Sequence, residues 1–494
     1  MRYFSNADKL KDEAVVVPVF ENNNILDDKL KKIDNAVNKL LSSAIKDIRL
    51  ERDQMIIIYA GKDIKYLVLY GFGDRKNLDI NSYANSVANL TRQIKSSNIK
   101  SFTLAVHLFK EFSQKELVEK TVQSIMLSNY QFIKFKTTDL DKVKNVEMAG
   151  LIVEKESKEI DEAIKTATII SEAMNKTREL IATPPNIANP EYVANYAKKI
   201  ADSNKIKCEI SDEKSLEKNN FNLLLGVGKG SLSKPRFVVL EYSGGQKNEK
   251  PIVLVGKGVT FDSGGLNIKP SVGGTNYMLN MKDDKAGACS VIHVIEAASK
   301  LKLQVNIVGL LPLAENMPSG NAYRNDDIIK AHSGITVEIR HTDAEGRLIL
   351  ADALSYAAKY NPSAIIDIAT LTGASLIALG SFASPFMTNN RNLGDKIRKA
   401  SESSLEKAWE FPIWSEYDEG LKSDIADIKS LTDDSDAGSI IGAVFLKNFV
   451  KEGTAWAHMD IAGSSWGRSE KGMSQKGPTG YGVRLIIELL RTWK

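Results

Sequence analysis

The sequence predicts an α/β protein of two domains: a smaller α/β domain at the N-terminus and a larger α/β domain with a mixed central sheet at the C-terminus. Three observations lead to this prediction. The chain has 494 residues, which is more than one hydrophobic core usually organises. Short apolar segments with strand periodicity alternate with segments of helical periodicity in both halves. A long amphipathic stretch between the halves predicts a helix that joins them.

The N-terminal region, residues 1–150, is expected to form the smaller domain. Its predicted strands are residues 14–20, 54–60, 66–71 and 101–107, with lysine-rich helical segments between them. His107 lies in an alternating apolar run, which favours a packed side chain over a metal ligand. The sequence shows no compact cluster of reactive residues here, so the role of this domain stays open.

Residues 151–184 are expected to contain the connecting helix. Apolar side chains recur there at helical spacing, with charged residues between them, at Ile160, Ala163, Ala167, Ile170, Met174 and Ile181. The letters TPPN at 183–186 end the pattern, because proline does not continue a helix. The larger domain then covers residues 185–494.

The larger domain alternates predicted strands with predicted helices. The strands are residues 237–242, 252–256, 304–312, 336–340, 364–369 and 458–461. The helices include residues 286–300, 348–359 and 437–450. Such alternation is typical of a layered fold with a largely parallel or mixed sheet. Sites in these folds form where loops leave the carboxyl ends of strands.

Composition excludes several classes of protein. Lys and Arg number 66 against 62 Asp and Glu, so a net charge of +4 gives no global attraction to nucleic acid or acidic membrane, although a local patch stays open. Two cysteines do not indicate a disulfide framework and fit a reducing compartment. The N-terminus lacks the apolar run of a signal peptide, so we expect a cytoplasmic protein. The uncharged stretch 368–387 contains glycine and proline, which favours a buried strand and a short helix over a membrane span.

Two segments of the larger domain contain most of the candidate functional residues. In the first, GKGVTFDSGGLNIKP at 256–270, a predicted strand leads into a glycine-rich loop, and MKDDKAG follows at 281–287. The second is HTDAEGRL at 341–348, between a strand and a helix. Taken singly, each acid has an ordinary explanation as a turn residue or a helix cap. A phosphate-binding loop is an alternative for the Gly-Lys-Gly at 256–258, although its acidic neighbours would repel phosphate.

The combination of acids predicts a metal centre. Four carboxylates at the same strand ends would repel one another strongly unless cations neutralised them, as a pair of divalent ions does in two-metal hydrolases. The chain has only five histidines and two cysteines, so we do not expect a structural zinc site made of Cys and His ligands. Oxygen ligands suit Mn²⁺ or Mg²⁺, and zinc also accepts carboxylates. His293 and His458 lie in apolar stretches and are expected in the core.

These motifs resemble those of the leucine aminopeptidase family, also called the cytosol aminopeptidase family. GKGVTFDSGGLNIKP and TDAEGRL at 342–348 carry the resemblance. Supporting matches are TRELIATPPN at 177–186, DIATLTGA at 367–374, LKSDIADIK at 421–429 and AHMDIAGSSW at 457–466. The N-terminal domain resembles the family only in its size and in the general character of its sequence.

The resemblance implies a leucyl aminopeptidase that removes N-terminal Leu, Met and other apolar residues from peptides with a free N-terminus. Two divalent ions, Mn²⁺ or Zn²⁺ with Mg²⁺ as a third candidate, would be bound by Lys257, Asp262, Asp284, Asp343 and Glu345. By the same resemblance, Lys269 would stabilise the oxyanion, and Arg347 would hold a bicarbonate that serves as general base. Met281 and Ala462 would line the pocket for the first side chain, while Thr370, Leu371 and Gly373 would hold the substrate backbone. Members of the family assemble as homohexamers.

The chain departs from the family pattern at several positions. His341 stands where the family usually has Asn, and Lys285 replaces an apolar residue. The loop between Lys269 and Asp284 is longer than in better-known members, so Asp283 competes with Asp284 as the metal ligand. The match to Met-Lys-x-Asp favours Asp284.

Two other functions stay open. The chain could be a binding protein on the same scaffold, since some relatives bind DNA, although the near-neutral charge counts against this. It could also hydrolyse another bond, such as a phosphoester, because two-metal sites occur in such enzymes too. A requirement for a free amine in the substrate would distinguish the aminopeptidase.

Overall fold

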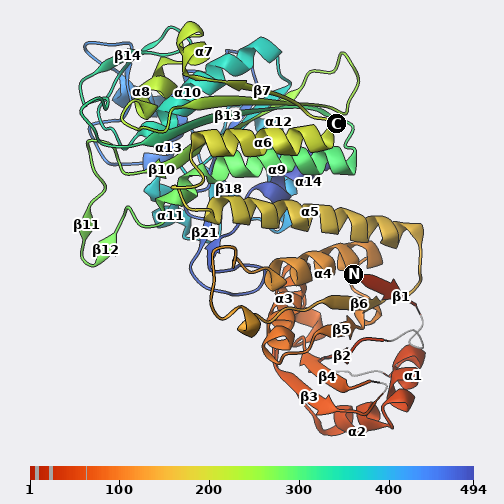
Figure 1. Ribbon diagram of the computed structural model, residues 1–494. Helices are drawn as coiled ribbons and strands as arrows, with labels where there is room; N and C mark the ends of the chain where they lie inside the picture. Colours follow the sequence, from red (N-terminus) through yellow and green to blue (C-terminus); the bar gives the residue numbers. More distant parts are fainter. Residues whose placement is uncertain (6–10, 22–25, 63, 494) are drawn as a thin grey trace. The chain divides into compact units, whose positions relative to one another are not determined.

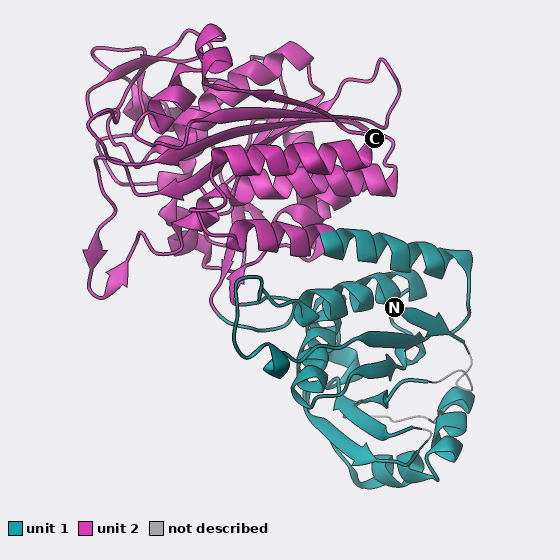
Figure 2. Cartoon of the chain, viewed as in Figure 1, with its two compact units in different colours: residues 1–172, 469–475 teal, residues 173–468, 476–494 magenta. Residues whose placement is uncertain are grey.

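Residues 1–5, 11–21, 26–62 and 64–493 are described in the computed structural model of the chain. They divide into two compact units (Figure 2). Unit 1 consists of residues 1–172 and 469–475, and unit 2 of residues 173–468 and 476–494. Each unit contains a mixed sheet with helices, and the larger sheet lies in unit 2. The predicted α/β fold class is confirmed.

Among the described residues of unit 1, six strands form one sheet in the order β1-β6-β5-β2-β4-β3, and only the β3–β4 pair is antiparallel. The strands are β1 (Arg2–Phe4), β2 (Ala14–Val19), β3 (Met55–Tyr59), β4 (Tyr66–Gly71), β5 (Ser101–Leu104) and β6 (Met148–Ile152). The helices are α1 (Asp28–Ala36), α2 (Leu40–Asp47), α3 (Ile80–Ser96) and α4 (Gln114–Asn129). Alternate residues of β2 enter different apolar clusters: Val16 packs with α3 and α4, whereas Val15 and Val17 pack with α1 and α2.

The strand predicted at 101–107 ends earlier than expected. It stops at Leu104, because Val106–Leu108 form a 3-10 turn. The buried His107 Nε2 lies 2.9 Å from Asp27 Oδ2. The predicted connecting helix is α5 (Lys158–Ala182), and the division between the two units falls inside it, after Glu172.

The described part of unit 2 has a nine-stranded sheet in the order β18-β17-β20-β16-β9-β13-β8-β7, with β10 also paired to β13. The strands are β7 (Lys207–Ser211), β8 (Arg236–Ser243), β9 (Ile252–Gly256), β10 (Gly258–Asp262), β13 (Asn306–Asn316), β16 (Ala364–Ala369), β17 (Ser384–Thr388), β18 (Ala408–Glu410) and β20 (Trp456–Asp460). The central strands β20, β16, β9, β13 and β10 run parallel to one another. Their carboxyl ends therefore meet at one edge of the sheet.

Helices cover both faces of this sheet (Figure 1). Side chains of α8, α10 and α13 form the apolar core on one face, and α9 packs against β9, β13 and β16 on the other. The helices are α6 (Pro190–Asn204), α7 (Glu213–Lys218), α8 (Asn222–Gly228), α9 (Ala286–Leu301), α10 (Glu345–Ala357), α11 (Gly373–Leu379), α12 (Arg391–Ser404), α13 (Gly438–Lys447) and α14 (Val483–Arg491). None of the described helices is both long and apolar enough to cross a membrane.

The first turn of α9 lies directly against the strand ends. A Cβ on Gly256 would come within 2.6 Å of the Ala288 Cα, and a Cβ on Gly287 would overlap the carbonyl oxygen of Ile368. Glycine at both positions allows this approach, and the Ala288 N–H donates to the Lys257 carbonyl at 2.8 Å. The 3-10 helix η5 (Met281–Lys285), which precedes α9, is thereby placed beside Lys257.

Three small sheets complete the described part of unit 2. One is the hairpin β11 (Ser271–Val272) and β12 (Thr275–Asn276), and another is the pair β21 (Trp466–Gly467) and β22 (Gly477–Pro478). The third joins β14 (Ile328–Lys330), β15 (Thr336–Glu338) and β19 (Ile428–Lys429). The strand predicted at 336–340 is therefore shorter and outside the central sheet, because it pairs with β14 and β19 instead.

Candidate metal centre

The residues singled out in the sequence gather at the carboxyl edge of the central sheet. Lys257 follows β9, Asp262 ends β10 and Thr370 follows β16. Two polar residues, Asn316 at the end of β13 and Asp460 at the end of β20, reach the same edge. The arrangement follows from the parallel order of these strands, which the alternation of elements in the sequence predicts.

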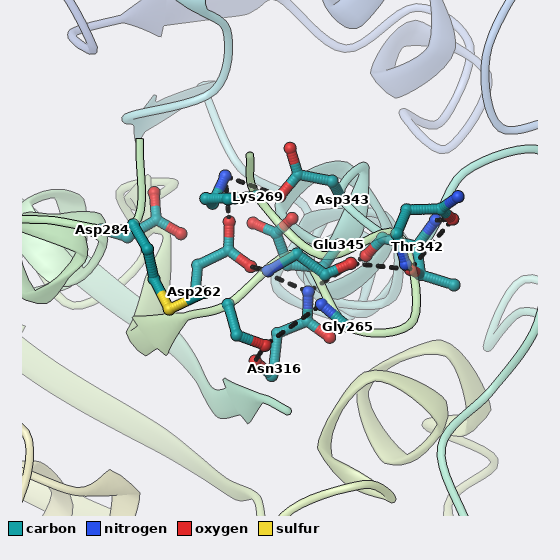
Figure 3. A network of polar contacts seen from close by, with 12 residues as sticks. Asp262, Gly265, Lys269, Asp284, Asn316, Thr342, Asp343 and Glu345 are labelled. Carbon is teal, nitrogen blue, oxygen red and sulfur yellow. Dashed lines mark hydrogen bonds and ion pairs between the residues drawn. The ribbon is translucent and has the colours of Figure 1, made fainter. Parts of the chain in front are cut away.

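Three carboxylates form the centre of this site (Figure 3). Oxygens of Asp262, Asp343 and Glu345 lie within 4.8 Å of one another, and the side chains of Asp262 and Glu345 are buried. Burial and the charge of Asp262 raise the pKa of Asp343 to about 8 and that of Glu345 to about 8. Divalent cations would relieve this repulsion and keep the carboxylates ionised.

Two ammonium groups lie among these acids. Lys257 Nζ is 2.6 Å from Asp284 Oδ1 and 2.9 Å from Glu345 Oε1. Lys269 Nζ is 2.7 Å from Asp262 Oδ2 and 2.6 Å from Asp343 Oδ1. Burial lowers the pKa of both lysines, but the carboxylates raise it more, so each pKa lies above its ordinary value.

The two adjacent aspartates of η5 face different partners. Asp284 Oδ1 accepts hydrogen bonds from Lys257 Nζ and from Thr370 Oγ1, the latter at 2.8 Å. Its Oδ2 is buried and has no hydrogen-bond partner among the described residues. Asp283 Oδ2 instead accepts from Ser465 Oγ. Asp283 Oδ1 is likewise buried without a partner among the described residues, so the difference lies in the neighbours. Asp284 contacts Lys257, which also contacts Glu345 of the three-acid cluster, and the geometry therefore favours Asp284 over Asp283.

The five candidate ligands fit a pair of divalent ions in their chemistry. They offer four carboxylates and one amine, and oxygen-rich sets of this kind suit Mn²⁺, Mg²⁺ or Zn²⁺. Glu345 is the first residue of α10, where the helix dipole also favours a negative charge.

A second layer of polar groups, missed in the sequence, orients the acids. Asn316 Nδ2 donates to Asp262 Oδ1 at 2.8 Å and to the Thr342 carbonyl at 3.0 Å. That carbonyl also accepts from the buried Tyr323 hydroxyl at 2.5 Å, and Thr342 Oγ1 donates to the Gly264 carbonyl at 2.6 Å. The two loops that carry the candidate ligands are therefore tied together. The sequence predicts a strand that ends at residue 312, whereas β13 continues to Asn316. The longer strand is what brings Asn316 to the site.

The positions where the chain departs from the family pattern have structural roles of their own. His341 Nδ1 accepts from the Asp343 N–H at 3.1 Å and so helps to shape the loop. Lys285 Nζ turns away from the acids and donates to the carbonyls of Ile181, Thr183 and Lys282, at 3.1, 3.2 and 2.8 Å. Burial lowers the pKa of Lys285 to about 8.

The remaining predicted residues lie around the same edge. Arg347 is buried in α10, donates to the Ser430 carbonyl at 2.9 Å, and has its pKa lowered to about 10 by burial. Met281 lies in η5 with Asp284. Thr370 and Leu371 lie between β16 and α11, Gly373 begins α11, and Ala462 lies two residues beyond β20. Thr370 is in direct contact with the cluster, because its carbonyl accepts from Lys257 Nζ at 2.7 Å.

Comparison with known protein families agrees with this geometry. The profile described as "Cytosol aminopeptidase family, catalytic domain" matches residues 175–487. The chain belongs to the cytosol aminopeptidase family. The profile of the family's N-terminal domain matches residues 16–139.

Individual relatives and solved structures support the assignment. The "Probable cytosol aminopeptidase" of Geobacter sp. (strain M21) is 41% identical over 86% of this chain and 85% of its own. That of Geobacter sulfurreducens is 38% identical over 97% of this chain and 96% of its own. The solved structure of "Bottromycin maturation enzyme BotP" is 27% identical, covers 97% of this chain and 99% of its own, and has a TM-score of 0.84. A second structure of that enzyme is in complex with Mn and has a TM-score of 0.85. As a member of the family, the chain is a metal-dependent aminopeptidase, a hydrolase that acts on peptides.

Proposed function

We propose that the protein is a leucyl aminopeptidase that uses two divalent ions and prefers N-terminal Leu, Met and other apolar residues. The observation that carries this proposal is the cluster of Asp262, Asp343 and Glu345 beside the Lys257–Asp284 pair. Its acids come from segments far apart in the sequence, and Asp262, Asp284 and Glu345 are buried while Asp343 is partly buried. Gathering these acids away from water costs free energy unless cations are bound there.

Each candidate ligand has a definite place in the proposal. One ion would be held by Asp262, Asp343 and Glu345, and the other by Lys257, Asp262, Asp284 and Glu345. When bound, such a pair of ions polarises the scissile carbonyl and lowers the pKa of the attacking water. Lys257 binds a cation only as a neutral amine, and two neighbouring positive charges would lower its raised pKa. Mn²⁺ and Zn²⁺ are the proposed ions, with Mg²⁺ as the third candidate.

Lys269 and Arg347 are the proposed catalytic residues. The Lys269 ammonium contacts Asp262 and Asp343, two of the three acids that would hold the first ion. From this position it can donate a hydrogen bond to an oxyanion that develops beside that ion. The buried Arg347 guanidinium would hold a bicarbonate ion near the attacking water. Met281 and Ala462 would line the pocket for the first side chain, and Thr370, Leu371 and Gly373 would hold the substrate backbone.

The test is the release of p-nitroaniline from leucyl-, methionyl-, alanyl- and glutamyl-p-nitroanilide, with Mn²⁺, with Zn²⁺ and after chelation. We expect metal-dependent release, fastest for the leucyl and methionyl compounds. An N-acetylated leucyl compound serves as the control, because it lacks the free amine that the site requires. Release from the acetylated compound, or hydrolysis of p-nitrophenyl phosphate instead, would contradict the proposal.

The homohexamer implied by the family resemblance and the cytoplasmic location expected from the sequence are part of the same proposal. Light scattering of the purified protein gives the number of chains. A mass near that of six chains is expected, and the mass of a single chain would contradict it.

A further inference from the structure

Asp460 binds two segments that the proposed function assigns to the substrate. It ends β20, is fully buried, and its Oδ1 accepts backbone N–H groups of Leu371, Thr372 and Ala462 at 3.1, 3.3 and 3.2 Å. Its Oδ2 accepts the Thr372 hydroxyl at 2.6 Å. One carboxylate therefore holds both the connection between β16 and α11 and the turn after β20. Hydrogen bonds to an ionised acceptor are stronger than neutral ones.

The same contacts fix the direction of two peptide groups. In a trans peptide the N–H and the C=O point in opposite directions, and the described chain has no cis peptide bond. The Thr370–Leu371 peptide donates to Asp460 on one side and accepts from Lys257 Nζ at 2.7 Å on the other. This peptide thus links Asp460 to a candidate metal ligand.

The next peptide is oriented in the same way. The Thr372 N–H donates to Asp460, so the Leu371 carbonyl points away from Asp460. A carbonyl held in this direction is suited to accept a hydrogen bond from a substrate backbone N–H. The Thr372 hydroxyl also lies 2.7 Å from Ser439 Oγ, which ties the connection to α13.

Asp460 also interacts electrostatically with Arg347, one of the two proposed catalytic residues. The Asp460 carboxylate raises the pKa of Arg347 against the effect of burial. Asp460 has no lysine or arginine within ion-pair distance among the described residues, and its charge is met by N–H and O–H groups instead.

We propose that Asp460 is a positioning residue that sets the spacing of the substrate backbone site at Leu371 relative to the side-chain pocket at Ala462. The inference rests on the proposed aminopeptidase function and goes beyond it. Because this spacing decides how well a large first side chain fits, Asp460 determines the preference for leucine over alanine. It acts on substrate binding, and Lys257 keeps its contacts with Asp284 and Glu345 independently of Asp460.

The chain offers matched variants for the test. Asp460→Ala removes all four acceptor contacts. Asp460→Asn keeps one oxygen for the three N–H groups, and its amide can donate to the Thr372 hydroxyl. Thr372→Val removes only the Oδ2 contact. Asp367→Asn is the control, because Asp367 is an equally buried carboxylate on the neighbouring strand β16 that accepts from Trp456 Nε1 at 2.8 Å and contacts His458.

The measurements are kcat and KM for leucyl- and alanyl-p-nitroanilide, together with metal content per chain. For Asp460→Ala we expect KM for the leucyl compound to rise about 10-fold or more, the leucine-to-alanine preference to fall by a similar factor, and metal content to stay unchanged. Asp460→Asn should recover most of the preference, and Thr372→Val should lose only part of it. Asp367→Asn should change thermal stability and leave the preference intact.

The outcomes separate the inference from the proposed function. Asp460→Ala with unaltered preference, or Asp367→Asn with an equal loss, would overturn the positioning role while the unaltered protein still hydrolyses the leucyl compound. If Asp460→Ala does not fold, Thr372→Val carries the comparison, because it should lose part of the leucine-to-alanine preference while Asp460→Asn keeps most of it. A leucine-to-alanine preference in Thr372→Val equal to that of the unaltered protein then overturns the role. No hydrolysis of the leucyl compound by the unaltered, metal-loaded protein would overturn both proposals.

Discussion

Asn316 Nδ2 donates to Asp262 Oδ1 at 2.8 Å and thereby fixes the orientation of a carboxylate 54 positions away in the sequence. The same amide donates to the Thr342 carbonyl, so one side chain contacts both loops that carry candidate ligands. Groups that orient metal ligands in this way typically contribute a factor of about 10–100 to metal affinity.

Asn316→Ala should therefore weaken binding of Mn²⁺ by about 10–100-fold. Titration of the metal-free protein with Mn²⁺, followed by electron paramagnetic resonance of the free ion, gives the affinity. Asn306→Ala is the matched control, because Asn306 lies at the opposite end of the same strand and donates to Gln246 and Glu249 carbonyls. Equal affinities of the two variants would count against an orienting role for Asn316.

Gly346→Ala should disturb the site without changing any ligand. A Cβ at this position would lie 2.6 Å from Lys257 Nζ and even closer to the Lys257 Cε. Because Lys257 is buried and paired, its side chain has little room to move, and overpacking of this kind costs about 1–3 kcal/mol. We expect fewer than two ions per chain by elemental analysis. Gly320→Ala, where a Cβ meets no atom within 4 Å, should retain both ions.

Lys269→Ala should separate metal binding from turnover. Removal of the ammonium takes away stabilisation of the developing negative charge, and loss of one such donor typically lowers kcat by about 10²–10³. Metal content should stay near two ions per chain, since Lys269 is not among the proposed ligands. Lys330→Ala, at an exposed position of β14, is the control. Unchanged kcat in the Lys269 variant would refute the proposed role.

Asp343→Ala should show the opposite pattern. This variant removes one of the three clustered carboxylates, so metal content should fall and activity should return only partly at high Mn²⁺ concentration. Asp326→Ala, whose side chain is 80% exposed, should behave as the unaltered protein does. Normal metal content in the Asp343 variant would remove Asp343 from the ligand set.

His293 makes the stability of unit 2 dependent on pH. Burial lowers the pKa of His293 to about 4, whereas an unfolded histidine titrates near 6.5. Between these values the unfolded state binds more protons, so the free energy of unfolding falls as the pH decreases, by an amount on the order of 3 kcal/mol in total. Burial also raises the pKa of Asp352 to about 7, which acts in the opposite direction over the same range.

The measurement is therefore the difference in melting temperature between the unaltered protein and His293→Gln from pH 7 to pH 4. The neutral amide can replace the contacts with Thr177 and Tyr196 and does not titrate. We expect the difference to shrink as the pH decreases, because only the unaltered protein loses stability through His293. Parallel curves would contradict the assignment.

Much of the arrangement could be predicted from the sequence, for reasons that individual residues illustrate. Lys257 follows the predicted strand 252–256, and parallel strands bring their carboxyl ends together, so the convergence at this edge follows from strand order. The sequence predicts Asp262 in a glycine-rich loop, whereas it ends a further strand, β10 (Gly258–Asp262). The structure shows this convergence at Asp262, Asp343 and Glu345, while their roles as metal ligands stay predictions.

Other features could not be predicted because they depend on contacts between distant segments. The strand at 336–338 has the local pattern of a sheet strand, yet its partners are β14 and β19, and pairing partners are not encoded in a local pattern. Asn316 is a single polar residue at a strand end outside the quoted motifs, and Asp460 lies in AHMDIAGSSW at 457–466 without a role assigned to it from the sequence. Their importance follows from the backbone and side-chain groups that they contact in the folded chain.

The loops of the metal centre meet only in the folded chain, since the ligand candidates follow different strands or precede different helices. An ion that binds the assembled loops and not the extended chain depletes the unfolded population by mass action. The supply of divalent ions during synthesis would then set how much protein matures, as well as how fast the finished enzyme works.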